Sequence, residues 1–379
     1  MTNYQKYIPQ LRQMLLSGSE DNITLAIEIA ESMNLVDEIM YPFRKFWKIY
    51  SETRKSDRFI MSKLGNMHYL KLEGKKLKTI PEAVFMLPKL NYLLLGNNEL
   101  ETIPAEIANL SNLADLDLRN NRFTNFPKQI FALKNLKKLV LLGNEIDVLP
   151  NEISELKKLE HLHLAYNYIE TLPNSLTHIS NLCTLNVNDN EIINFPAEIA
   201  QMPSLHAIFV ENNKLNNFPK VSVNLRDLNI SRNKFVKTPD VLLNKNNLNK
   251  LDISFNPGFV WNLNKVKISK LNHFAFEKTV VNRFNAISNL KLIKFYGERN
   301  LLVKVFSKCK WPEHFVHFLS GMKVSIFVYD EYADCEDGWW IGHPDEDYYK
   351  QVEDYYGFRK EDLIAERFVR NERLKCVRA

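Results

Sequence analysis

The chain has 379 residues, of which 45% are apolar and 25% charged, and its formal net charge is +5. This composition excludes a disordered or low-complexity chain and is sufficient for a large buried core. No window contains 18 consecutive apolar residues, and the opening sequence has no uninterrupted apolar segment followed by a small-residue cleavage site. We therefore expect neither a membrane span nor a secretory leader.

The spacing of the cysteines also indicates the redox compartment of the protein. Cys183, Cys309, Cys335 and Cys376 lie far apart and form no C-x-x-C pair. This spacing predicts neither a disulfide framework nor a zinc ribbon, and it is typical of a reducing compartment. We expect a cytoplasmic protein.

Residues 1–66 are predicted to form two or three helices. The stretch "SEDNITLAIEIAESMNLVDEIM" has acidic residues in its first turn and apolar residues at Leu25, Ile27, Ile29 and Met33. Acidic side chains near a helix N-terminus are favourable because they complement the helix dipole.

Nine similar units follow one another over residues 67–257. Each reads L-x-x-L-x-L-x-x-N-x-L, as in "LNYLLLGNNELETIP" and "LEHLHLAYNYIETLP", and the step between units is 23 residues, broken once by a step of 20. The units begin at Met67, Leu90, Leu113, Leu136, Leu159, Leu182, Leu205, Leu225 and Leu248. A fixed period of this length indicates a solenoid. The pattern resembles the 23-residue form of the leucine-rich repeat family.

The repeat pattern has a physical explanation. The residues at the first, fourth and sixth positions point inward, and the third to fifth residues form a short strand that pairs in parallel with the next unit. No single unit can bury its leucine face alone. We predict an α/β leucine-rich repeat solenoid, a horseshoe with a parallel concave sheet, in which residues 1–66 form a helical N-terminal cap.

An asparagine column follows the strands at Asn98, Asn121, Asn144, Asn167, Asn190, Asn213, Asn233 and Asn256. A buried amide both donates and accepts hydrogen bonds, so this structural ladder can satisfy the backbone groups of the turns. A proline column, Pro81, Pro104, Pro127, Pro150, Pro173, Pro196, Pro219 and Pro239, is predicted to open the short convex segments.

The pattern has irregular ends. The first unit carries Lys75 in the asparagine column, and "KVSVN" at 220–224 replaces the usual convex segment and predicts a more extended path. We predict a C-terminal cap at 258–307, in which "LNKVKI" forms a degenerate tenth strand, and a small acidic, aromatic-rich module at 308–379. Between Asp330 and Asp362 that module has twelve acidic and three basic residues, and its "GWWIGH" and "YGFRKEDLI" are similar to a small SH3-like barrel.

Catalytic motifs are scarce. The eleven glycines form no G-x-G-x-x-G, G-x-x-x-x-G-K or G-x-S-x-G, so we predict no catalytic residues and no cofactor. His161 and His163 share one strand face, as two metal ligands would, but the matching positions of the next unit hold Thr184 and Asn186. We expect no metal site.

One enzymatic alternative concerns Cys335. Cys335, Glu336 and Asp337 spell C-E-D after the repeats, which resembles the nucleophile motif of bacterial effector ubiquitin ligases. In that family a large helical domain surrounds the motif, whereas only 42 residues follow Asp337 here. The acidic neighbours also disfavour a thiolate.

The strand residues on the concave side are the predicted binding surface. Leu94, Val140, Leu142 and Phe209 are apolar residues at positions expected to be exposed, and aromatic residues mixed with charges are typical of interface anchors. The predicted surface comprises Tyr69, Tyr92, Leu94, Asp115, Asp117, Arg119, Lys138, Val140, Leu142, His161, His163, Tyr166, Asn186, Phe209, Asp227 and Asp252. We expect a non-catalytic scaffold that binds another protein.

A further alternative is anion or nucleic-acid binding by the basic repeats. The lysines lie mostly in convex segments such as "LKKL" and "ELKK", without interleaved aromatic residues, which is typical of solvated surfaces. We therefore expect no nucleic-acid partner.

Overall fold

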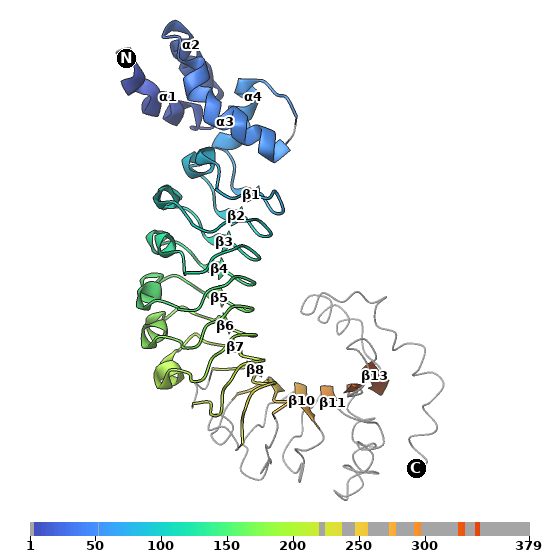
Figure 1. Cartoon of the computed structure of the whole chain (residues 1–379). Coiled ribbons are helices and arrows are strands. Elements are labelled where there is room, and N and C mark those ends of the chain that lie inside the picture. The colour runs from blue at the N-terminus through green and yellow to red at the C-terminus, as the bar shows by residue number, and fades with distance from the viewer. Residues whose placement is uncertain are drawn as a thin grey trace, which may run out of the picture. The chain divides into compact units, whose positions relative to one another are not determined.

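The computed structural model describes residues 4–51, 53–219, 224–236 and 247–256, together with four strands beyond them at 273–277, 292–296, 325–329 and 338–341. The chain divides into two compact units, residues 1–186 and 187–379. Each is described by itself below, and Figure 1 gives the labels of the elements.

The first unit begins with helices. After a short 3-10 turn, η1 (Gln5–Tyr7), come α1 (Ile8–Leu15), α2 (Glu20–Ser32), α3 (Val36–Ser51) and α4 (Asp57–Gly65). The prediction of two or three helices was therefore wrong, because Ser19 and Ser56 each begin a separate helix. Their side chains accept hydrogen bonds from the backbone N–H of Asn22 and Phe59, both at 3.4 Å.

Only some of the apolar residues of α2 lie on its buried side. Ile23, Ala26, Ile27 and Ala30 are buried, whereas Leu25 is exposed. Positions three and four apart share one face of a helix, and that face turns toward the neighbouring helices α1 and α4. An apolar residue outside this spacing is left in solvent.

The helices cover the first repeat. α3 packs against the 3-10 helix of that repeat, and Arg12 of α1 lies 3.6 Å from Glu82. The side chains of Phe43 and Phe46 in α3 are fully buried. This closes the exposed end of the leucine core.

Six parallel strands follow in the first unit. They are β1 (Tyr69–Lys71), β2 (Tyr92–Leu94), β3 (Asp115–Asp117), β4 (Lys138–Val140), β5 (His161–His163) and β6 (Thr184–Asn186). Each occupies the third to fifth positions of its repeat, so the predicted strand positions are confirmed. The leucines before, within and after each strand are buried, for example Leu113, Leu116 and Leu118.

Short 3-10 helices occupy the other side of each repeat. They are η2 (Glu82–Met86), η3 (Ala105–Asn109), η4 (Lys128–Ala132), η5 (Asn151–Glu155) and η6 (Asn174–His178), with η7 (Ala197–Gln201) in the second unit. A proline immediately precedes each of these helices. Its fixed φ suits the start of a helical turn, and its missing N–H leaves no donor unsatisfied there.

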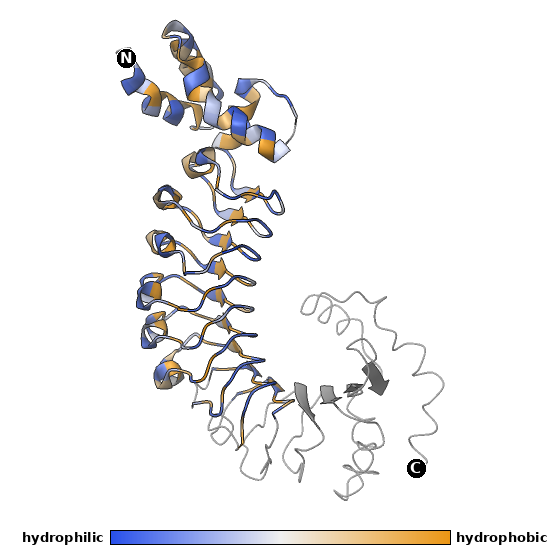
Figure 2. Cartoon of the chain, viewed as in Figure 1, coloured by the Kyte–Doolittle hydropathy of each residue, from blue (hydrophilic) through white to orange (hydrophobic). Residues whose placement is uncertain are grey.

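The asparagine column lies under the turns that follow the strands. All eight side chains are buried. Asn144 is representative: its amide donates to the carbonyls of Leu118 at 3.1 Å and Leu141 at 2.9 Å, and its Oδ1 accepts from the N–H of Phe123 at 3.2 Å. One side chain thus satisfies backbone groups of two successive repeats. Figure 2 shows the hydrophilic turns beside the strands.

The eighth position of each repeat has a left-handed backbone. Its residues are Gly74, Asn97, Asn120, Gly143, Tyr166, Asp189, Asn212, Arg232 and Phe255, with φ between 50° and 68°. Glycine, asparagine and aspartate tolerate this conformation, whereas a bulky side chain is strained there by about 1 to 3 kcal/mol. Tyr166, Arg232 and Phe255 are the strained members.

The second unit contains further parallel strands. β7 (Ala207–Phe209), β8 (Asp227–Asn229) and β9 (Lys250–Asp252) pair in register, followed by β10 (His273–Glu277), β11 (Leu292–Tyr296) and β12 (Ser325–Tyr329), and β13 (Gly338–Ile341) pairs antiparallel with β12. β10 and β11 fall in the predicted C-terminal cap, and β12 and β13 in the predicted module. The convex segment at 220–223, Pro239, the "LNKVKI" strand and Cys335 lie outside the described residues.

Candidate functional site

The strand register gathers the predicted site residues into two columns. In the first unit the third positions are Tyr69, Tyr92, Asp115, Lys138, His161 and Thr184, and the fifth positions are Lys71, Leu94, Asp117, Val140, His163 and Asn186. Side chains at these positions point away from the leucine core because residues alternate across a strand. We call this surface of β1–β6 the open face.

An aromatic pair marks the beginning of the open face. Tyr69 and Tyr92 are aligned on β1 and β2, and their ring centroids are 6.4 Å apart at a tilt of 44°. Both remain exposed, at 52% and 48%. Two neighbouring rings that retain half of their surface in solvent can bury a substantial apolar area when another molecule covers them.

A buried carboxylate, Asp117, lies on β3 opposite Leu94 of β2. The Asp117 side chain is only 2% exposed and accepts from the backbone N–H of Arg119 at 2.9 Å and from its Nε at 2.7 Å. This hydrogen bond raises the pKa of the Arg119 guanidinium. The ion pair holds the Arg119 side chain in one position.

Gly96 makes space for that arginine. A Cβ built on Gly96 would lie 2.8 Å from Arg119 Cγ and 3.3 Å from Glu73 Oε1. Glu73 in turn pairs with Lys71 at 2.9 Å. The Arg119 side chain thus lies over the second repeat and approaches the first, and charges from the first and third repeats form a fixed group.

The central part of the open face carries Asp115, Lys138, His161 and His163. Asp115 and Lys138 lie 3.7 Å apart, and burial raises the pKa of Asp115 despite this cation. Burial, followed by Lys138 and His161, lowers the pKa of His163 to about 4. His163 is therefore neutral at physiological pH and acts as a hydrogen-bonding group.

The expected exposure of Val140 was wrong. Val140 is buried at 7%, and Leu94, Leu142 and Phe209 are half-buried. Parallel strands lie only about 4.8 Å apart, so longer side chains on the neighbouring strands cover a residue between them. Val140 lies between Asp117 and His163 and is covered in this way.

Two fifth-position residues of the second unit, Asn229 and the predicted site residue Asp252, stabilise turns. Asn229 Oδ1 accepts from the N–H of Ser231 at 3.0 Å and from its Oγ at 2.7 Å, and Asp252 Oδ1 accepts from Ser254 in the same manner at 3.0 and 2.6 Å. Asp117 makes the same contact with Arg119 N–H in the first unit. A fifth-position acid or amide therefore fixes the turn after its own strand.

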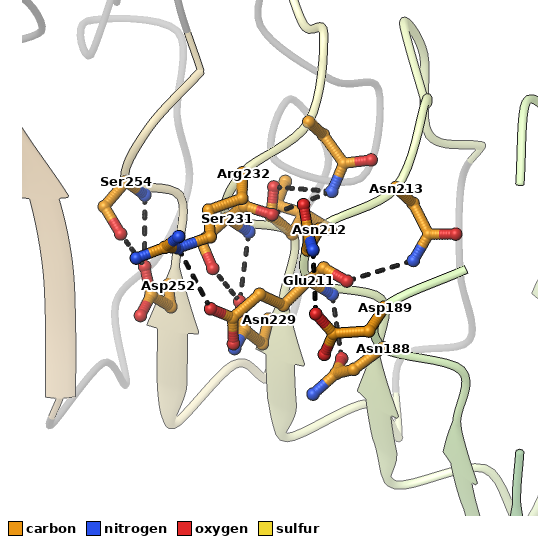
Figure 3. Close-up of polar contacts among 12 residues, drawn as sticks. Asn188, Asp189, Glu211, Asn212, Asn213, Asn229, Ser231, Arg232, Asp252 and Ser254 are labelled. Carbon is orange, nitrogen blue, oxygen red and sulfur yellow. Dashed lines mark hydrogen bonds and ion pairs between the residues drawn. The ribbon is translucent and has the colours of Figure 1, made fainter. Parts of the chain in front are cut away.

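Glu211 joins these turns to one another. Its Oε2 accepts from Asn229 Nδ2 at 3.1 Å, its Oε1 lies 3.4 Å from Arg232 Nε, and its N–H donates to Asn188 Oδ1 at 2.8 Å. Figure 3 shows this network, in which Asp189 also accepts from Asn212. Burial raises the pKa of Glu211, with a smaller contribution from Asp252. The network is largely self-satisfied, and no pattern in the sequence identified Glu211.

The remaining site residues have varied settings. Asp227 is half-buried, burial raises its pKa, and its strand pairs with that of Lys250. Asn186 is half-buried, and Tyr166 is 59% exposed on a left-handed turn.

Within the described residues there is no group of three or more His, Cys, Asp or Glu side chains that could hold a metal ion. His161 and His163 face Thr184 and Asn186 on β6.

Comparison with known families agrees with this geometry. Residues 82–164 match the model of a leucine-rich repeat region, and residues 158–179 match the model of a single leucine-rich repeat. The same residues form the strand, asparagine turn and 3-10 helix described above. This is a leucine-rich repeat protein.

Solved structures resemble this leucine-rich repeat protein. A leucine-rich repeat protein of Leptospira interrogans is 28% identical with a TM-score of 0.53, and the match covers 66% of each chain. The plant peptide hormone receptor RGFR1 in complex with RGF2 is 21% identical over 60% of this chain and 44% of its own, with a TM-score of 0.43. Internalin C2 of Listeria monocytogenes is 20% identical over 56% and 92%, with a TM-score of 0.47.

The match spans slightly less than two thirds of the Leptospira chain and under half of the plant receptor. No curated protein matches this leucine-rich repeat protein. Among the residues that the structure describes, no helix has both the length and the apolar character needed to cross a bilayer.

Proposed function

We infer that this leucine-rich repeat protein is a non-catalytic scaffold that binds another protein on the open face of β1–β6. The observation that carries the proposal is the exposed pair Tyr69 and Tyr92, 6.4 Å apart beside a fixed group of charges. Tyrosine is among the residues that contribute most to protein interfaces, because it buries a large area at little entropic cost.

The charged side chains near the two tyrosines favour selective binding of one kind of partner surface. Arg119 is held by Asp117, and Lys71 by Glu73, before any partner arrives. Side chains that are already ordered lose little entropy on binding. Their alternating signs favour a partner surface of complementary charge and disfavour others.

The cations of the repeats favour a protein over a nucleic acid. Lys134, Lys137 and Arg122 pair with Glu155, Glu160 and Glu99 at 2.8, 2.9 and 3.2 Å. Paired cations offer little net charge to phosphate groups, whose neutralisation dominates nucleic-acid affinity. A cytoplasmic location is part of the same proposal and rests on the four widely spaced cysteines of the sequence.

A display library of protein fragments from the native host tests the proposal. Fragments selected on the wild-type protein are measured against a Tyr69→Ala/Tyr92→Ala variant by calorimetry. We expect the double variant to bind at least about 30-fold more weakly, because each truncated interface anchor costs about 1 to 2 kcal/mol. Tyr168→Ala is the control, since Tyr168 is 59% exposed and lies outside the strands.

The outcome distinguishes the open face from other surfaces. Equal affinity of the wild-type protein and the double variant for every selected fragment would place the binding surface elsewhere. Equal loss in the Tyr168→Ala variant would also contradict the proposal, because it would show no preference for the strands.

A further inference from the structure

A second surface, remote from the open face in sequence, lies at the start of α4. Phe59 is 40% exposed, and the ammonium groups of Lys55 and Lys63 lie over its ring at 5.4 and 5.8 Å from the centroid. Arg58 is exposed next to it. We call Lys55, Arg58, Phe59 and Lys63 the cap patch.

The Phe59 ring of the cap patch packs against α3. The edge of the Phe59 ring meets Trp47 of α3, with centroids 5.9 Å apart and an interplanar angle of 88°. Ser56 caps α4 at the same point. The exposed phenyl ring is therefore a fixed feature of the surface.

Among the described residues, the acid next to the patch in sequence is Asp57, and it is already paired. Asp57 accepts from Nε of Arg44 at 2.8 Å and from its Nη2 at 2.5 Å. Lys55, Arg58 and Lys63 form no ion pair with any described residue. Within the described residues, the cap patch therefore presents three cations without a carboxylate partner.

The outward side of α3 has the same combination of groups. Tyr41 is exposed, and Lys45 lies 6.0 Å from its ring centroid. Lys48 is exposed one turn further along, at a spacing that places all three side chains on one side of the helix. α3 packs against α4, so the two basic, aromatic segments belong to one helical region, as Figure 1 shows.

We propose that the cap patch binds the surface of a membrane rich in anionic phospholipids. Lysine and arginine near such a surface each contribute about 1 kcal/mol of attraction, and an exposed phenyl ring gains free energy by entering the interface. An exposed apolar ring surrounded by cations suits a partner that has anionic headgroups at its surface and hydrocarbon beneath them. The proposal concerns a surface separate from the protein-binding open face.

The geometry of the ring favours lipid over a single-stranded nucleic acid. Bases stack on the faces of aromatic side chains, and here two ammonium groups already lie over the Phe59 ring. The cations of the patch need anionic groups nearby, and its exposed phenyl ring needs an apolar region. A bilayer interface satisfies both.

Vesicle flotation with the full chain tests the proposal. The vesicles contain phosphatidylcholine with 30 mol% phosphatidylserine, or phosphatidylcholine alone, at about 0.1 M salt, where the Debye length is about 10 Å. We expect binding to the anionic vesicles only. Lys55→Glu/Arg58→Glu/Lys63→Glu should weaken it by about a hundredfold or more.

Three further variants separate the effects of local charge and of ring insertion from the effect of net charge. Lys78→Glu/Lys157→Glu/Lys234→Glu changes the net charge equally, at exposed lysines outside the patch, and should bind within about threefold of the wild type. Phe59→Ala should weaken binding about fivefold, whereas Phe59→Leu should retain it. Thermal melting shows that each variant is folded.

The following results would overturn the proposal. They are failure of the wild-type protein to float with anionic vesicles, equal loss in the two charge-reversal variants, and equal binding to phosphatidylcholine alone. Binding of a single-stranded oligonucleotide without vesicle binding would overturn it in favour of a nucleic-acid surface.

Discussion

The side chain of Arg119 lies in the space above Gly96, where a Cβ would approach Arg119 Cγ to 2.8 Å. The two residues belong to adjacent repeats, and the close approach lets Arg119 reach Asp117 and the neighbourhood of Glu73. The absence of a side chain at position 96 therefore sets the position of a cation on the open face.

Gly96→Ala should destabilise the protein by about 1 to 3 kcal/mol, because the added methyl group displaces Arg119 from a packed position. Urea denaturation measures the change. In an Arg119→Ala background the same substitution should cost less than about 0.5 kcal/mol, since only the end of the flexible Glu73 side chain is then left to shift. Additive costs in the double variant would show that the two residues do not interact.

Asn144→Leu should lower the free energy of unfolding by about 1 to 3 kcal/mol, because it leaves buried backbone groups of Leu118, Leu141 and Phe123 without a partner. Asn125→Leu is the control, since Asn125 is exposed and its amide contacts only the adjacent Thr124. An unchanged melting temperature for Asn144→Leu would contradict the role of the asparagine column.

His163 should make the protein less stable in mild acid. Its pKa falls to about 4 in the folded state, chiefly through burial, whereas an unfolded histidine titrates near 6.5. Above 6.5 both states are neutral and pH has no effect through this group. As pH falls from 6.5 toward 4 the unfolded state binds the proton first, so stability declines by at most about 3 kcal/mol.

The measurement compares stability at pH 7 and pH 5 in the wild type, in His163→Gln and in His161→Gln. His163→Gln should show a clearly smaller decline with acid than the wild type. Burial of Asp115 and Glu211 raises their pKa and acts in the opposite direction, so the difference between variants is the informative quantity. Identical pH profiles would refute the burial of a neutral His163.

Tyr166→Asn should stabilise the protein by about 0.5 to 1.5 kcal/mol. Tyr166 has a φ of 54°, which is costly for a bulky residue and accessible to asparagine, as at Asn97 and Asn120. The matched control is Tyr168→Asn, at a residue that is equally exposed but has no left-handed backbone. Thermal melting should rise for the first and not for the second; a decrease at Tyr166 would mean that its side-chain contacts outweigh the strain.

Much of the fold was predictable because every repeat must bury the same leucine positions and satisfy the backbone groups of the same turn. The leucines at the first, fourth and sixth positions had to face a common core, and this set β2 at Tyr92–Leu94 and β3 at Asp115–Asp117. Asn121 and Asn144 had to satisfy turns in which backbone groups lose their partners. The direction of Tyr69 and Tyr92 away from the core follows from the same alternation.

The helical region was less predictable because its sequence has no repeat. Ser19 and Ser56 are ordinary caps that act only where a helix follows, and the side of α2 that becomes buried depends on the helices packed against it. Leu25, apolar yet exposed, shows that a hydrophobic residue alone does not identify the buried side.

The sequence by itself determined the repeat period, the strand positions, the asparagine column and the residues that point to the open face, because these follow from the periodic arrangement of side chains along one chain. Only the tertiary structure decided which of those residues meet solvent. Val140 is covered, Tyr92 is exposed, Asp117 is buried beneath Arg119, and His163 has a lowered pKa. Each outcome depends on side chains from strands 23 residues apart in sequence but about 4.8 Å apart in space, where burial and local charge are set by neighbours.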